Sequence, residues 1–159
     1  MVALVTDIIT NEPKAVHRTA LTLDGRKIEI EGSDRLALGP IGGGAIKVTP
    51  DADVTLCLGI GEGLESTLSL RGLPEFGPTT PVWSLLTAGG VEALPVLAGV
   101  ECLWIAVDND PNGRGQRAAQ ACADRWQAAG REVFLVKPTA EKSDLNDVTN
   151  KKGRRHAAR

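Results

Sequence analysis

The segment LWIAVDNDPNGRGQRAAQACADRW, from Leu103 to Trp126, changes character sharply near its centre. Its first residues are apolar and predict a buried strand. Two carboxylates, Asp108 and Asp110, then precede a stretch with the periodicity of an amphipathic helix, which Gly130 closes. Like charges at such close range repel each other, so another part of the site is expected to offset this repulsion.

Strands and helices alternate on both sides of this segment, and the alternation predicts the fold. Short apolar runs predict strands, and amphipathic stretches between them predict helices. Crossover connections of this kind produce a parallel sheet with helices on its faces, so the sequence predicts an α/β domain. The strands are expected within 54–63, 82–90, 100–108 and 131–138, and the helices within 64–72, 91–99 and 113–130.

The region before this domain has weaker patterns. Two runs with some alternation flank Asp24-Gly25, a pair that favours a tight turn, so residues 17–32 are expected to form a hairpin. The glycines at 42–44 favour a flexible turn over a phosphate-binding loop, and a short strand follows at 45–48. The predicted organisation is a lead-in at 1–16, a β-rich N-terminal extension at 17–50, a domain with a four-stranded parallel sheet at 53–149, and a basic tail at 150–159.

Acidic residues follow three of the four predicted parallel strands. In an open parallel sheet, ligands bind beyond the carboxyl ends of the strands, where the strand order changes direction. If the first and third strands are neighbours, their acidic residues meet at that point. Each residue alone is explained as a helix cap or a solvated first-turn charge, but the whole set favours a metal site. The residues are Glu62, Asp108, Asp110, Asp144 and Asp147.

The chemistry of these ligands indicates which metal they would hold. The cluster offers only oxygen, so Mg²⁺ or Mn²⁺ is expected rather than Zn²⁺. A calcium loop beginning at Asp108 would need Glu at its twelfth position, where the chain has Ala119. Phosphatases of the haloacid dehalogenase type carry Thr or Val where this chain has Asn112. Of the two histidines, His17 and His156, the first is expected to be an ordinary strand or surface residue.

The composition is that of an ordinary globular domain of 159 residues, with 42% hydrophobic and 24% charged residues. No apolar run approaches a membrane span, no signal peptide is recognisable, and three widely spaced cysteines are expected to be reduced, so a cytoplasmic protein is predicted. Residues 151–159 hold five basic and no acidic residues, which leaves the body with a net charge of −7. Such a body suits carboxylates gathered around cations better than a general nucleic-acid-binding surface.

Three stretches together resemble the Toprim domain, the metal-dependent catalytic domain of bacterial-type primases, topoisomerases and some nucleases. They are GEGLESTLSL, IAVDNDPNGRGQRAA and KSDLNDV, which lie between residues 61 and 148. The family motif is Glu-Gly after the first strand and Asp-x-Asp after the third. The segment from His17 to Val48 extends the resemblance to the primase-like Toprim proteins of phages, plasmids and integrated elements.

The resemblance implies a role for each matching residue. Glu62 would be the general acid/base, and Asp108 and Asp110 would hold Mg²⁺, assisted by Asp144 or Asp147. Phosphate or nucleic-acid contacts are assigned to Arg114, Arg117 and Lys142, for which a solvated surface position is an equal alternative.

The function expected from this resemblance is Mg²⁺-dependent nucleotidyl transfer in primer synthesis, as part of a DNA primase. Its partners would be a single-stranded DNA template, nucleoside triphosphates and a helicase, with no membrane involved. Two alternatives stay open: a Toprim nuclease that hydrolyses phosphodiesters, and a DNA-binding recombination module without catalysis.

Overall fold

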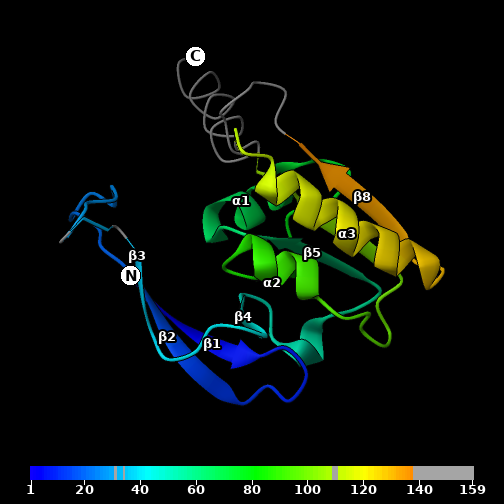
Figure 1. Cartoon of the computed structure of the whole chain (residues 1–159), viewed down its shortest axis with the longest axis horizontal. Helices are drawn as coiled ribbons and strands as arrows, with labels where there is room; N and C mark the ends of the chain where they lie inside the picture. The colour runs from blue at the N-terminus through cyan, green and yellow to red at the C-terminus, as the bar shows by residue number, and fades with distance from the viewer. Residues whose placement is uncertain (31, 34, 109–110, 138–159) are drawn as a thin grey trace.

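The computed structural model describes residues 1–30, 32–33, 35–108 and 111–137, and eight strands in these residues form one sheet (Figure 1). The strand order is β3-β2-β1-β4-β6-β5-β7-β8. The sheet has an antiparallel half, built from the N-terminal strands, and a parallel half that carries the helices (Figure 1).

The parallel half confirms the predicted fold class. Its strands are β5 (Cys57–Gly61), β6 (Val82–Ser84), β7 (Cys102–Ala106) and β8 (Glu132–Val136). The first and third predicted strands, β5 and β7, are parallel neighbours, and Gly61 pairs with Ala106 at their carboxyl ends. Each of the four strands is built from an apolar run, as expected for strands that are covered on both faces.

The antiparallel half corrects the expectation for the N-terminus. It consists of β1 (Val2–Asp7), β2 (Pro13–Thr19), β3 (Arg35–Leu38) and β4 (Gly44–Lys47). Residues 1–16, expected as a lead-in, therefore contain one whole strand and part of a second. The last strand, β4, pairs with β6 through Ile46 and Ser84, so the extension continues the parallel sheet.

The predicted hairpin at residues 17–32 is also corrected, because the main hairpin joins β1 to β2. Asp24-Gly25 does turn the chain, with Gly25 at φ +83°, but only isolated bridges flank it. Most side chains from 21 to 30 are exposed, so this segment buries no apolar face that would fix a strand register. In contrast, β1 and β2 bury Val5 and Ala15, and this burial stabilises their pairing.

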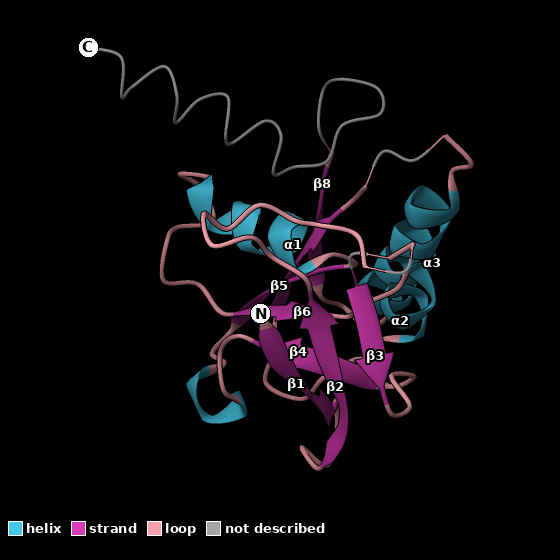
Figure 2. Ribbon diagram, turned by 90° about the vertical axis from the view of Figure 1, so that its left-hand side faces the viewer, coloured by secondary structure: helices cyan, strands magenta, loops and turns pink. Residues whose placement is uncertain are grey.

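Helices cover both faces of the parallel half, as Figure 2 shows. One face carries α1 (Leu64–Ser69), which continues as a short 3₁₀ turn to Gly72. The other face carries α2 (Ala88–Ala93) and α3 (Arg114–Ala128). None of the described helices is both long enough and apolar enough to cross a bilayer.

Helix α2 begins and ends earlier in the chain than the helix predicted at 91–99. It begins earlier, where the Thr87 side chain accepts a hydrogen bond from the backbone N–H of Gly90 at 2.9 Å, which is a typical N-terminal cap. It ends before Pro95, because a proline disfavours the helical conformation of the residue that precedes it.

The main core lies between the sheet and the pair α2 and α3. Fully buried side chains from the central strands, including Leu58, Ile60 and Ile105, pack there against Trp126. A smaller cluster on the α1 face contains Leu70, Phe76, Val82 and Ala106. The three cysteines are free thiols, as expected.

A third apolar cluster joins the two halves of the sheet at the carboxyl ends of the parallel strands. Buried Val5, Ala15 and Ile46 from the N-terminal strands pack there against Leu64 and Leu86, among others. Leu64 follows β5 and Leu86 follows β6, so the N-terminal strands lie against the loops that leave the parallel sheet.

The close packing of β5 against the α1 face gives a test of this core. A Cβ atom at Gly59 would lie 2.5 Å from Cζ of Phe76 and 2.9 Å from Cδ1 of Leu70, which are both buried. We expect Gly59→Ala to lower the free energy of unfolding by about 1–3 kcal/mol through overpacking, measured by urea denaturation. Gly42→Ala is the matched control, since a Cβ atom there has no neighbour within 4 Å. Equal stability of the two variants would contradict this packing.

Candidate active site

The candidate site lies at the aligned carboxyl ends of β5 and β7. Glu62 directly follows β5, and Asp108 follows β7 by two residues. Because Gly61 pairs with Ala106, the two chain segments that carry the carboxylates leave the sheet side by side. The structure therefore places Glu62 and Asp108 at the same edge, as the sequence predicted.

The backbone around Glu62 is held from two sides. The hydroxyl of Ser84, which is fully buried on β6, donates a hydrogen bond to the Glu62 carbonyl oxygen at 3.0 Å. The backbone N–H of Leu85 donates to the Gly61 carbonyl oxygen at 2.8 Å. At Gly61 the first turn of α1 comes so close that a Cβ atom would lie 2.6 Å from Oγ1 of Thr67. These contacts fix the point from which the Glu62 side chain starts.

Asp108 lies where β7 leaves the sheet. The ladder continues one residue past the strand, because the N–H of Val107 donates to the Val136 carbonyl oxygen at 2.9 Å. The side chain is partly buried, and its Oδ1 atom is shielded from solvent. A shielded carboxylate oxygen needs a hydrogen bond or a cation to offset the loss of hydration.

The donor atoms at this edge fit a hard divalent cation, because both carboxylates offer only oxygen. Within residues 1–30, 32–33, 35–108 and 111–137, no group of three or more His, Cys, Asp or Glu side chains could hold a metal. The remaining predicted ligands fall outside these ranges. They are Asp110, Asp144 and Asp147, and the predicted phosphate contact Lys142 also lies outside the described residues.

The two arginines predicted to contact phosphate are exposed at the start of α3. A guanidinium nitrogen of Arg114 lies 2.5 Å from a carboxylate oxygen of Glu92, which belongs to α2. Arg117 donates a hydrogen bond to the backbone carbonyl oxygen of Asn112 at 3.0 Å. Each therefore already has a contact within the protein, and a phosphate contact stays a prediction for both.

A small cavity of about 30 Å³ lies beside Glu62, between the two halves of the sheet. Its wall includes His17 and Thr19 from β2, together with Glu62 and Ser84 from the parallel half. Leu86, also in the wall, has φ +69°, a left-handed conformation that leucine rarely adopts. The sequence predicts an ordinary strand or surface residue at His17, because a single histidine in a weak strand pattern carries no signal of its own, and the structure places it on β2 in the wall of this cavity.

Ion pairs join the N-terminal extension to the first turn of α1. Nζ of Lys27 lies 2.7 Å from Oε1 of Glu65, and a guanidinium nitrogen of Arg35 lies 3.4 Å from Oε2. Burial raises the pKa of Glu65, but the hydrogen bond from Lys27 and the charges of Arg35 and Lys27 outweigh it and lower the pKa. The Glu65 carboxylate therefore attaches the N-terminal extension to the first turn of α1, three residues after Glu62.

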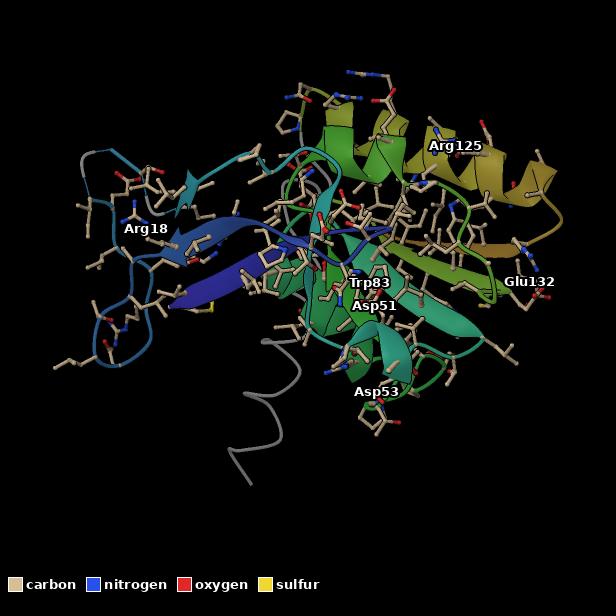
Figure 3. All side chains as sticks on the ribbon, turned by 90° about the horizontal axis from the view of Figure 1, so that it is seen from below. Arg18, Asp51, Asp53, Trp83, Arg125 and Glu132 are labelled. Atoms are coloured by element: carbon tan, nitrogen blue, oxygen red, sulfur yellow. The ribbon has the colours of Figure 1, made fainter. Side chains whose placement is uncertain are left out.

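A larger and mainly apolar cavity of about 550 Å³ lies at the other end of the parallel strands. Its wall includes Asp51 and Trp83, which Figure 3 shows close together, and residues 97–100, which precede β7. Because it opens at the amino ends of the strands, it is separate from the carboxylates. Its size alone does not make it the site of chemistry.

Comparison with known proteins agrees with the geometry at the carboxyl ends. A family model for the Toprim domain matches residues 57–155, a range that begins at β5 and includes every predicted site residue. Neither the curated proteins nor the solved structures include a significant match. Toprim domains bind divalent metal ions, typically Mg²⁺, and act on nucleic acids in primases, nucleases and topoisomerases. With more than half of its length matched and its two central carboxylates at the expected strand ends, the chain belongs to the Toprim domain family.

Proposed function

We propose that this chain catalyses Mg²⁺-dependent nucleotidyl transfer on nucleic acid, and that the reaction is primer synthesis. The observation that carries this proposal is the position of Glu62 and Asp108 at the adjoining carboxyl ends of β5 and β7 in a Toprim domain. Two carboxylates that follow neighbouring strands can serve two purposes, because one can exchange a proton while the other binds a cation.

Glu62 acts as the general acid/base in this proposal. Its carboxylate takes the proton from the hydroxyl whose oxygen attacks the α-phosphorus of the nucleoside triphosphate, and the bond from that phosphorus to pyrophosphate breaks as the new ester bond forms. The hydrogen bond from Ser84 to the Glu62 backbone supports this role, because a catalytic base must be held within reach of the proton that it removes.

Asp108 and Asp110 would hold the metal, with Asp144 or Asp147 as a further ligand. When bound, divalent ions neutralise charge on the phosphate oxygens and help to align the attacking and leaving oxygens. The same charge would offset the repulsion among the carboxylates, which is otherwise unfavourable at such short spacing.

Primer synthesis is favoured over hydrolysis by the N-terminal segment. Residues 17–48 resemble the region that precedes the Toprim domain in primase-like proteins of mobile elements, and they contribute to the cavity beside Glu62. The substrates would be nucleoside triphosphates and a single-stranded DNA template, with a helicase as a partner. Arg114, Arg117 and Lys142 would contact phosphate groups.

The metal site is tested by Asp108→Asn. Removing the charge at the end of β7 is expected to abolish Mn²⁺ and Mg²⁺ binding measured by isothermal titration calorimetry, with thermal unfolding close to wild type. Asp124→Asn, which changes an exposed aspartate on α3, should bind metal like wild type. The assignment of Asp108 is wrong if both variants bind metal equally. Asp144→Asn and Asp147→Asn, measured in the same way, identify which of these residues is a ligand.

The catalytic role is tested by Glu62→Gln. The amide cannot accept a proton, so the rate should fall by about 100-fold or more while metal binding is retained. The assay contains Mg²⁺, nucleoside triphosphates and a single-stranded template, with Glu75→Gln as an exposed control. New oligomers would support primer synthesis, and shortened template would support a nuclease. A wild-type protein with neither activity would contradict catalysis and leave a binding module.

A further inference from the structure

The inward face of β2 reaches the candidate active site. Side chains alternate along a strand, so Ala15, His17 and Thr19 share one face. Ala15 belongs to the apolar cluster that includes Leu64 and Leu86, which follow β5 and β6. The packing of this cluster therefore determines where His17 lies, two residues further along β2.

His17 and Glu62 border the same cavity. Its volume of about 30 Å³ is enough to hold ordered water between the side chains that line it. Nδ1 of His17 is shielded from solvent. Water held in this cavity would connect the polar side chains that line it.

The charges around the cavity indicate which group His17 serves. Two carboxylates border it, Glu62 and Glu65. Glu65 is engaged by Lys27 at 2.7 Å and by Arg35 at 3.4 Å, and both of these cations come from the N-terminal extension. Glu62 is the carboxylate to which the proposed function assigns the proton transfer, and its backbone is fixed by Ser84 from the same wall.

We propose that His17 is a positioning residue that orients the Glu62 carboxylate, either directly or through water held in the cavity. The N-terminal strands then contribute to the candidate site in two ways, through the apolar contacts of Ala15 and through the side chain of His17. The effect on rate rests on the proposed function, whereas the contact between His17 and Glu62 can be tested without any activity.

Nuclear magnetic resonance of the imidazole nitrogens tests the contact itself. The chain has two histidines, so His156→Gln assigns the signals of His17. At one fixed pH and without metal, Glu62→Gln should shift both ring nitrogen signals of His17 clearly, and the exposed control Glu75→Gln should leave them in place. The proposal is overturned if Glu62→Gln leaves them unchanged, or if only Glu65→Gln shifts them.

Steady-state kinetics test the consequence for the reaction. His17→Ala should lower kcat by about 10- to 100-fold with little change in KM, as for other residues that orient a catalytic group. His17→Gln should recover part of kcat, because its amide can still donate a hydrogen bond into the cavity. Arg18→Gln is the control, since Arg18 is the exposed neighbour on the same strand, labelled in Figure 3.

The outcomes separate this proposal from the proposed function. Wild-type kcat in His17→Ala would overturn the positioning role even if Glu62→Gln is inactive. A protein without any activity would contradict the proposed function, and the imidazole signals would still decide whether His17 and Glu62 are in contact. Calorimetry with Mn²⁺ should give wild-type affinity in His17→Ala, and a loss of metal binding there would also overturn the proposal, because His17 would then act on the metal site.

Discussion

The hydrogen-bonded pairing of β5 with a parallel strand on each side is the constraint on which the rest of the structure depends. β6 and β7 align their carboxyl ends with that of β5, through Ser84 and Ala106 opposite Gly61. At Gly61 the chain passes so close to Thr67 and Ala106 that a side chain would not fit. The direction in which Glu62 leaves the sheet is thus determined by strand register and by close packing, both of which are costly to change.

The carboxylates described at this edge fall into two groups, one paired with cations of the protein and one assigned to chemistry. Glu65 is neutralised within the protein by Lys27 and Arg35, and these ion pairs attach the extension to α1. Glu62 and Asp108 follow β5 and β7 at the same edge, and we propose that this is where the chain binds a divalent metal ion. Because one carboxylate is paired internally, the repulsion near α1 is reduced without removing charge from the two carboxylates assigned to chemistry.

The sequence was sufficient to predict the four parallel strands and two of the three helices that cover them, but it placed α2 too late in the chain. Short apolar runs such as the one at β7, bounded by turn residues, are typical of strands buried in a parallel sheet. Acidic residues follow these runs, so a neighbouring position of the first and third strands was enough to predict that Glu62 and Asp108 lie at one edge. The N-terminal half could not be predicted in the same way, because β1 leaves Leu4 half-exposed and buries Val5, a pattern too weak to recognise. Its register depends on tertiary contacts with Leu64 and Leu86, which a local pattern does not contain.

The position of His17 beside Glu62 has the same physical origin. Nothing in the residues around His17 indicates chemistry, and only the packing of β1 and β2 against the loops after β5 and β6 brings it there. The pairing of β4 with the three-residue strand β6 also covers what would otherwise be a short open edge of the parallel sheet. The extension thus covers an edge, buries apolar side chains and borders the candidate site. Within the described residues, the parallel strands of the Toprim match and the N-terminal strands that precede it are better regarded as one sheet of eight strands than as a parallel domain with an attachment.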